Sequence, residues 1–292
     1  MADEVTARVA TEGRVRHEML DEGRRLVDAA RGEGLTLRLL GGLAVREHCR
    51  SRQLCERDYT DLDMVAPARD SRRLTAIFRE FGYTENLDVS TATANAEIQF
   101  VRPCAHDGES GAHDGESGAH DGEPRAHGGE SGARRVHPDD HVDVFLDTFR
   151  MDHDIALLRR LEIEPYTVSL SDLLLTKLQI FRMTEKDLRD IITLLADVDV
   201  GDRDGPGLIS GRYVGELCAD DWGLFYDVTM NLQRVGESVA MFDLDDAQTA
   251  RVNQAVLRLV AAIDGAPKSL RWRLRARVGT RKSWHSQLDD QE

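Results

Sequence analysis

The sequence predicts an α/β (α+β) protein in which a small mixed β-sheet flanked by helices precedes a mostly helical C-terminal region. Three observations support this. Short apolar runs that alternate with a period of two, as in strands, occur in the first half of the chain. Segments with helical spacing lie between these runs and dominate from residue 165 onward. The chain of 292 residues is long enough for two domains, which we expect at 1–160 and 161–292.

The composition limits the class of protein. With 41% hydrophobic residues the chain can bury a core, but it has no run of apolar residues long enough to span a membrane. The N-terminus is too charged for a signal peptide. The four cysteines form no C-x-x-C pair, which argues against a disulfide framework or zinc site and favours a cytoplasmic protein with reduced thiols. A net charge of −15 argues against indiscriminate binding to nucleic acid or anionic membranes.

Helices and strands alternate in the first half. In chain order we expect a helix at 14–30, a strand at 35–42 that two glycines interrupt, a helix at 43–52, a strand within 57–66, a helix at 71–83, and strands at 96–103 and 141–147. The strand predictions depend on apolar alternation, and the helix predictions depend on apolar residues that recur at three- and four-residue spacing.

A tandem heptapeptide separates the last two of these strands. Its copies begin at His106, His113, His120 and His127 and consist mainly of Gly, Ser, Asp and Glu. Such a segment cannot bury enough apolar surface to offset chain entropy, and its period has no apolar a/d positions for a coiled coil. We therefore expect a disordered insertion at about 105–134, at the tip of a hairpin; weak metal binding by the four histidines is the alternative.

The second half is predicted to be helical. The expected helices cover 171–183, 187–197, 213–236 and 247–263, and the Gly/Asp/Pro stretch 201–207 separates the second from the third. The final segment, 268–285, has seven Lys and Arg residues and no acid, with Trp272 and Trp284 between them. It is either a basic element docked on the acidic body or a contact surface for a nucleic-acid backbone.

Two carboxylates stand close together in the strand predicted within 57–66. Asp61 and Asp63 are two residues apart in the stretch RDYTDLDMVA. Because side chains alternate along a strand, both carboxylates leave the same face. Like charges held this close favour protonation unless a cation lies between them. That face is therefore either solvated or a metal site.

Other residues add to the case for a metal site. Gly41 and Gly42 end one strand and begin a helix, so that bare backbone N–H groups can approach an anion. Arg57 precedes the D-x-D pair, and a third acid, Asp143, lies on the apolar stretch HVDVF, which we expect to be a neighbouring strand. Three carboxylates beside an anion-binding turn suit Mg²⁺, and a pair of Mg²⁺ ions would support phosphoryl-transfer chemistry.

The motifs LLGGLAVREH, RDYTDLDMVA and HVDVF resemble the nucleotidyltransferase fold of the DNA polymerase β superfamily. Within it, the pattern R-x-x-T-D-L-D is most similar to the AbiEii/MenT-type toxin nucleotidyltransferases. The resemblance covers roughly residues 35–197. It implies a downstream Lys and a later Asp on helices, which 169–195 supplies, and it implies a tRNA acceptor end, a toxin role and a separate antitoxin protein. Leu43 stands where many relatives have Ser or Thr after the glycines.

The helical stretch 169–195 can also be interpreted from its residues. Lys177, one of only four lysines, falls in the middle of an apolar stripe. There it either contacts a ligand, such as a triphosphate, or extends its ammonium group to solvent along the apolar surface. In the next helix Asp187 lies at the edge of the inward face and Asp190 nearly opposite. We therefore expect Asp187 to belong to the site, unless it is an ordinary first-turn acid, and Asp190 to be solvated.

These observations predict a Mg²⁺-dependent nucleotidyltransferase that uses an NTP and releases pyrophosphate. Asp61, Asp63 and Asp143 would hold the metals, with Asp143 also activating the acceptor hydroxyl. Gly41, Gly42, Arg57 and Lys177 would bind the phosphates. Two alternatives remain open: a nucleotidyltransferase acting on a small molecule such as an aminoglycoside, which the acidic net charge would suit, and a non-catalytic module that only binds nucleotide.

Overall fold

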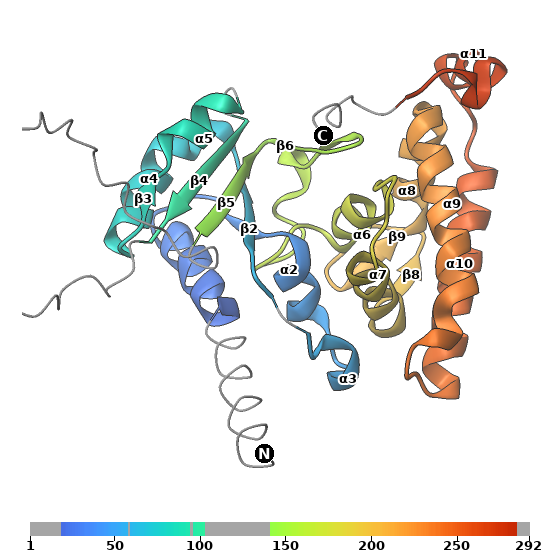
Figure 1. Cartoon of the computed structure of the whole chain (residues 1–292), viewed down its shortest axis with the longest axis horizontal. Helices are drawn as coiled ribbons and strands as arrows, with labels where there is room; N and C mark the ends of the chain where they lie inside the picture. The colour runs from blue at the N-terminus through green and yellow to red at the C-terminus, as the bar shows by residue number, and fades with distance from the viewer. Residues whose placement is uncertain (1–18, 58, 94–95, 103–140, 285–292) are drawn as a thin grey trace, which may run out of the picture.

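The computed structural model describes residues 19–57, 59–93, 96–102 and 141–284. It confirms the predicted fold class, because a mixed β-sheet lies beside a predominantly helical C-terminal region (Figure 1). The heptapeptide insertion predicted at about 105–134 lies outside the described residues, so its conformation remains a prediction. Within the described part of the chain, every helix is too short or too polar to cross a membrane.

The central sheet has five strands in the order β1-β2-β5-β4-β3. They are β1 (Arg38–Leu39), β2 (Leu62–Ala66), β3 (Thr84–Glu85), β4 (Glu97–Val101) and β5 (His141–Leu146). β2 and β5 run parallel, and the other neighbours run antiparallel. The strands expected around 35–42, 57–66, 96–103 and 141–147 are therefore present, whereas β3 is only two residues long and carries no alternation that could predict it.

The two faces of this sheet differ in chemistry. Met64, Val144 and Ile98 lie opposite one another on β2, β5 and β4, and all three are buried. The helix at 19–32 and α4 (Ser71–Glu80) cover this apolar face, since Gly23 packs against Leu62 and the ring of Phe78 stacks on that of Phe100. The opposite face carries the polar side chains of Asp63, Asp143 and Gln99 next to the apolar side chains of Val65 and Phe145, so that its polar part is available for a site.

The chain between β1 and β2 folds into two short helices. α2 (Gly41–His48) begins at the two glycines, as predicted, but it ends four residues earlier than expected and is followed by α3 (Arg52–Cys55). The remaining short elements of the first half are α5 (Leu87–Ala92), a hairpin of β6 (Thr148–Arg150) and β7 (Asp154–Ala156), and the 3₁₀ helices η1 (Ala68–Asp70) and η2 (Leu158–Arg160).

The C-terminal region consists mainly of packed helices. They are α6 (Leu170–Leu178), α7 (Glu185–Asp197), α8 (Gly211–Asp220), α9 (Trp222–Ser238), α10 (Asp246–Gly265) and α11 (Leu270–Val278), with η3 (Val239–Met241) and η4 (Gly279–Arg281). The single helix predicted at 213–236 is wrong: Asp221 interrupts it by accepting hydrogen bonds from the N–H groups of Gly223 and Leu224, which starts α9. The predicted linker 201–207 lies between two short parallel strands, β8 (Asp199–Gly201) and β9 (Leu208–Ser210).

α6 and α7 place the helical region next to the polar part of the sheet. Ser169 is the N-cap of α6, and its hydroxyl accepts a hydrogen bond from the Asp172 N–H. α7 begins with a capping box between Thr184 and Asp187. Both helices contact α2, and residues of the first turn of α7 line the same cavity as Gly42.

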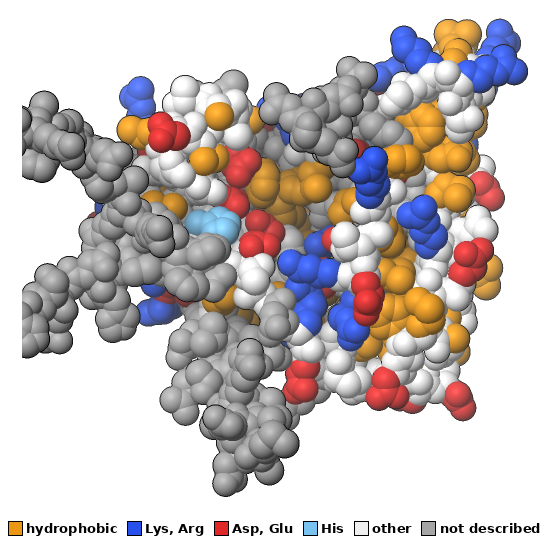
Figure 2. Space-filling view, in the orientation of Figure 1, with side chains coloured by type: hydrophobic (Ala, Val, Ile, Leu, Met, Phe, Trp, Pro, Cys, Tyr) orange, Lys and Arg blue, Asp and Glu red, His pale blue; other side chains and the backbone are white. Residues whose placement is uncertain are grey.

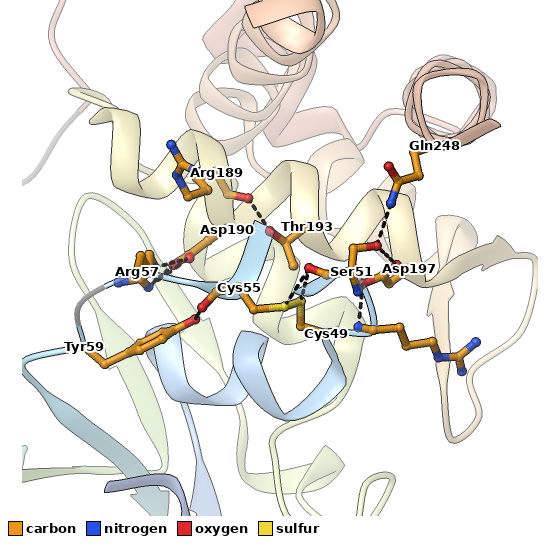
Figure 3. Close-up of a disulfide and its surroundings, with 11 residues drawn as sticks. Cys49, Ser51, Cys55, Arg57, Tyr59, Arg189, Asp190, Thr193, Asp197 and Gln248 are labelled. Carbon is orange, nitrogen blue, oxygen red and sulfur yellow. Dashed lines mark hydrogen bonds and ion pairs between the residues drawn. A yellow bond between two sulfur atoms is a disulfide. The ribbon is translucent and has the colours of Figure 1, made fainter. Parts of the chain in front are cut away.

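One cysteine prediction is wrong. Cys49 and Cys55 form a disulfide, with a Cα–Cα distance of 6.3 Å, whereas the sequence favoured reduced thiols (Figure 3). The spacing of six residues matches no common cysteine motif, but the turn between α2 and α3 brings the two Cα atoms within the range of natural disulfides. Cys218 is a free, buried thiol.

The basic C-terminal segment docks through its aromatic residues. Trp272 packs edge-on against Phe225, and Trp284 packs against Trp222 and Tyr226 of α9. Arg271, Arg273 and Arg277 of α11 are exposed, with a weak ion pair between Arg271 and Asp221. Arg275 is half-buried, because its guanidinium group lies over the ring of Trp222 and donates to the carbonyl groups of Gly279 and Lys282. α11 lies at the end of the helical region that is remote from α2 and α3 (Figure 1). The docked interpretation is thus confirmed for the tryptophans, and the exposed arginines remain available for a partner.

Candidate functional site

The site begins with two carboxylates that face each other on neighbouring strands. Asp63 of β2 and Asp143 of β5 are register partners in the parallel pair, which confirms the predicted proximity of their strands. Gln99 on β4 donates a hydrogen bond of 2.9 Å from its Nε2 to Asp143 Oδ1. His141 Nε2 lies 3.4 Å from the other oxygen of Asp143. The third carboxylate is therefore held in a fixed orientation toward Asp63.

Asp61 completes the acidic group just before β2 begins. It is 43% exposed and forms an ion pair of 3.6 Å with Lys186 in the first turn of α7. It nevertheless lies near enough to Asp63 to affect that residue's titration. This proximity agrees with the prediction that the side chains of Asp61 and Asp63 leave the same face of the strand.

The pKa of Asp63 is raised to about 6. Burial is the main cause, and the negative charges of Asp143 and Asp61 add to it, while Lys177 and Lys186 oppose it. Removal from water and nearby like charges both disfavour the ionised carboxylate. A divalent cation placed among these acids would reverse the effect, so the donor set suits a hard cation such as Mg²⁺.

The two glycines make room for charged side chains. Gly41 has a φ of +64°, and a Cβ at this position would collide with the Asp63 carboxylate. A Cβ at Gly42 would collide with the guanidinium group of Arg57. The glycines therefore allow an acid and a base to approach the backbone where α2 starts. No side chain in the described part of the chain caps that helix end, so its first N–H groups face this region.

Leu43 cannot serve as a replacement for the Ser or Thr found in similar motifs. Its side chain is completely buried in the core of the protein. The hydroxyl groups that line the cavity come instead from Thr60 and Thr184. The cavity therefore has hydroxyl groups although position 43 is Leu, and they come from the segments that contain Thr60 and Thr184.

Lys177 meets anions rather than solvent. Its side chain is 13% exposed, and Nζ lies 3.1 Å from Asp190 Oδ2 and 3.4 Å from Asp187 Oδ1. The interpretation in which the ammonium group extends to solvent is therefore wrong. The lysine forms ion pairs within the protein and at the same time lines the cavity.

The prediction that Asp190 is solvated is wrong. Its side chain is 2% exposed, and it accepts two hydrogen bonds from Arg57, from Nε at 3.0 Å and from the terminal nitrogen at 2.9 Å. The error arises because the apolar stripe of α7 marks only one buried side of this helix. A second side of α7 packs against the segment between α2 and β2, which contains Arg57. The guanidinium group of Arg57 also lies over the ring of Tyr59, 4.2 Å from the ring centroid.

Asp187 has a structural role and also lines the cavity. One carboxylate oxygen accepts hydrogen bonds from the Thr184 N–H and hydroxyl, which caps α7. The other oxygen faces Lys177. The structural interpretation of Asp187 therefore holds, and because its side chain also lines the cavity, its role in a functional site stays a prediction.

The segment from Cys49 to Arg57 is tied to α7 at both ends (Figure 3). Near one end, the Ser51 N–H and hydroxyl both donate to the carboxylate of Asp197, at 2.9 and 2.7 Å. At the other end, Arg57 bonds Asp190. The disulfide lies between these two anchors. This arrangement fixes Arg57 beside the cavity.

These side chains enclose a cavity of about 200 Å³. Its walls carry both signs of charge, from Arg57, Lys177, Lys186, Asp61, Asp63 and Asp187, together with Gly42, Tyr59, Thr60 and Thr184. Figure 2 shows acidic and basic side chains side by side where the sheet meets the helical region. Three cations next to clustered carboxylates suit a polyphosphate bound with a divalent cation.

The sequence did not reveal Lys186 as a site residue. The available signal was the scarcity of lysine: two of the four lysines, Lys177 and Lys186, fall within ten residues of each other. Asp190 was also missed, although its D-x-x-D spacing places it only about 60° around the helix from Asp187.

A scan of the sequence against protein-family models gives no match, and a comparison with curated proteins gives none either. The functional argument therefore depends on the residues of the site.

The carboxylates predicted to bind metal are not gathered around one point. Among the described residues, no group of three or more His, Cys, Asp or Glu side chains has the arrangement of a formed metal site. Asp61 is engaged by Lys186, and Asp143 by Gln99 and His141. Asp63 and Asp143 nevertheless face each other on neighbouring strands, and the charge of Asp143 contributes to the raised pKa of Asp63. A bound cation would relieve this repulsion between the two carboxylates.

Proposed function

We propose that this protein is a Mg²⁺-dependent nucleotidyltransferase that transfers NMP from an NTP to an acceptor hydroxyl and releases pyrophosphate. The observation that carries the proposal is the shared cavity in which Asp61 and Asp63 lie beside Arg57, Lys177 and Lys186. The carboxylates suit Mg²⁺, and the cations suit the phosphates of the nucleotide.

Each part of the cavity has a role in this reaction. Asp61, Asp63 and Asp143 would hold two Mg²⁺ ions, which supply charge neutralisation at the attacking and leaving oxygens. Lys177 and Lys186 would bind the β- and γ-phosphates, with the uncapped start of α2 at Gly41 and Gly42 as a further donor group. Arg57 contributes positive charge, while its bonds to Asp190 keep it in place.

The transfer itself balances without a further reactant. The acceptor oxygen forms a bond to the α-phosphorus, the bond from this phosphorus to the bridging oxygen breaks, and pyrophosphate leaves with that electron pair. Asp143 would accept the proton of the hydroxyl, directly or through a water molecule. Its hydrogen bond from Gln99 would hold the carboxylate in orientation for this step.

The resemblance to AbiEii/MenT-type enzymes supports a tRNA 3′ end as the acceptor and a toxin role with a separate antitoxin protein. The exposed arginines of α11 are compatible with an RNA partner. A small-molecule acceptor such as an aminoglycoside and a non-catalytic nucleotide-binding module are the other candidates.

One experiment separates these candidates. The protein is incubated with each α-labelled NTP and Mg²⁺ in the presence of total tRNA or of a panel of aminoglycosides. Label in tRNA supports the proposal, and label in an aminoglycoside supports the small-molecule alternative. Nucleotide binding without transfer to either acceptor would support the non-catalytic binding module. Cooperative thermal unfolding of the same sample would show that the protein is folded.

A further inference from the structure

A second cavity lies on the other side of Asp63 from the charged one. It has a volume of about 290 Å³ and shares the side chains of Asp63, Lys177 and Asp187 with the first cavity. Gly42 lines the charged cavity and Gly41 lines the second one. The rest of the second lining is apolar apart from Thr176, and consists of Leu40, Phe145, Phe149, Met151 and Ile180.

The aromatic wall of this cavity is built next to the third carboxylate. Phe145 follows Asp143 by two residues on β5, so that both side chains leave the same face of the sheet. Phe149 of β6 meets Phe145 edge-on, with 4.9 Å between the ring centroids. Met151 is 40% exposed at the rim. A hydrophobic patch beside the acidic and basic side chains is visible in Figure 2.

The geometry of phosphoryl transfer assigns a different reactant to each of the two cavities. This assignment rests on the proposed function. The attacking and leaving oxygens lie on opposite sides of the phosphorus in an in-line displacement. The leaving pyrophosphate is anionic and belongs in the cavity that contains Arg57, Lys177 and Lys186. The acceptor therefore approaches from the opposite side of Asp63, where the aromatic cavity and Asp143 lie.

We infer that the aromatic cavity binds the terminal nucleobase of an RNA acceptor, which stacks on Phe145 while Phe149 and Met151 close around the ring. The ribose hydroxyl of the same nucleotide would then lie beside Asp143. The volume is near the lower end of about 300–1,000 Å³ for small-molecule sites, which suits one ring system rather than a whole nucleotide.

The lining argues against a polycationic sugar in this cavity. An aminoglycoside requires several carboxylates. Among the described residues that line this cavity, the only carboxylates are Asp63 and Asp187, of which Asp187 already pairs with Lys177. Aromatic rings instead favour flat groups, and stacking of a base on an aromatic side chain changes affinity by about tenfold or more. The cavity therefore selects the class of acceptor as well as its position.

Binding of a short RNA tests the inference without catalysis. The probe is a single-stranded RNA trinucleotide with 2-aminopurine at its 3′ end, and the comparison probe is the same RNA with an abasic 3′ residue. We expect the wild-type protein to bind the base-bearing RNA about tenfold more tightly and to quench its fluorescence. Equal affinity for the two RNAs, or no binding of either, would overturn the inference.

Variants assign the effect to the cavity. Phe145→Leu should remove most of the difference between the two RNAs and most of the quenching. Met151→Ser, at an exposed position that does not open the core, should act in the same direction with a smaller effect. The matched control is Phe242→Leu, since Phe242 lines a different cavity, between α7 and α9, and should leave both probes unaffected.

NTP affinity, measured separately, distinguishes this inference from the proposed function. Phe145→Leu should leave NTP affinity unchanged. If the substitution weakens NTP binding and not RNA binding, the cavity holds the base of the NTP and the inference is wrong. Base-dependent RNA binding without transfer of label would instead support the inference while the proposed activity fails.

Discussion

Asp63 and Asp143 lie directly opposite each other on the parallel strands β2 and β5, and both point to the polar face of the sheet. Parallel register brings the two acids of different motifs together although eighty residues separate them in the chain. Burial is the main cause of the raised pKa of Asp63, and the negative charge of Asp143 adds to it, because both oppose ionisation of the carboxyl group.

The first prediction concerns stability without metal. Because the pKa of Asp63 is about 6 in the folded protein and the ordinary pKa of an Asp carboxyl group is 3.8, the folded state binds more protons than the unfolded state between these values. Stability from this group is therefore lost as pH rises from about 4 to about 6. Asp63→Asn should raise the unfolding free energy by about 1–3 kcal/mol at pH 7.5, with little difference near pH 4.

Denaturant unfolding of both proteins across this pH range, with chelator present, measures the difference. Asp202→Asn, at an exposed position in the linker between β8 and β9, is the control for loss of one negative charge. A stabilisation by Asp63→Asn that is the same at pH 4 and pH 7.5 would contradict the electrostatic explanation.

The second prediction concerns Mg²⁺. A ligand that binds only the folded state stabilises it, and a cation among these carboxylates relieves their repulsion. Millimolar Mg²⁺ should therefore raise the melting temperature of the wild-type protein at pH 7.5, and Asp63→Asn and Asp143→Asn should each reduce this rise. An equal rise in all three proteins would show that Mg²⁺ acts elsewhere.

Parts of this site could be predicted from the sequence because they depend on local periodicity. The period-two alternation around Asp63 and around Asp143 was sufficient to identify their strands, and the apolar stripe around Lys177 marked its unusual position. Asp190 was placed wrongly because its partner, Arg57, arrives from a segment distant in sequence. Packing between α7 and the chain before β2 decides this contact, and no local pattern encodes it.

Other elements escaped prediction for related reasons. β8 and β9 have only three residues each, too few to display an alternation. The break between α8 and α9 depends on one side chain, that of Asp221, which lies within an otherwise continuous helical pattern. The disulfide depends on a turn geometry that cysteine spacing does not reveal.

The third prediction compares the two lysines of the charged cavity. Replacing an unpaired lysine in an apolar stripe by Met would be neutral or stabilising, but Lys177 pairs with two acids, Asp187 and the buried Asp190. Lys177→Met should therefore lower the unfolding free energy by about 1–3 kcal/mol, less than a fully broken buried pair because Arg57 still bonds Asp190.

Lys186→Met serves as its counterpart. Its ion pair with Asp61 joins two side chains that are 47% and 43% exposed, so its loss should hardly change stability. Both substitutions should weaken NTP binding about tenfold or more, because each removes a charge-assisted contact to phosphate. Lys282→Met, distant from the cavity, is the control, and unchanged NTP affinity in both variants would remove the lysines from the proposed site.

The fourth prediction separates structure from binding at Arg57. Asp190→Asn leaves Arg57 and Lys177 without their shared buried carboxylate, and should lower stability by about 3 kcal/mol or more. If Arg57 acts mainly by being held in place, Arg57→Lys should also destabilise, because an ammonium group cannot reproduce the two-pronged contact. A stable Asp190→Asn protein with full activity would contradict this assignment.

The last prediction concerns the Cys49–Cys55 disulfide, which closes a short loop between the two anchors on α7. In the chain-entropy description, a loop of this length contributes about 2 kcal/mol. Reduction should therefore lower the melting temperature by several degrees, and the double variant Cys49→Ser/Cys55→Ser should melt at the temperature of the reduced wild-type protein and not respond to reductant.

Thiol labelling provides the independent check. Burial raises the pKa of Cys218 to about 12, so this thiol should not react in the native protein. In a Cys104→Ser background, reduction should therefore add one reactive thiol in the native protein, that of Cys49, because Cys55 is buried. After unfolding, reduction should add two. Affinity for NTP should survive reduction, because Ser51–Asp197 and Arg57–Asp190 hold the segment without the sulfur atoms. Loss of NTP binding on reduction, with the fold intact, would instead mean that the disulfide positions Arg57 and that the two anchors on α7 are insufficient.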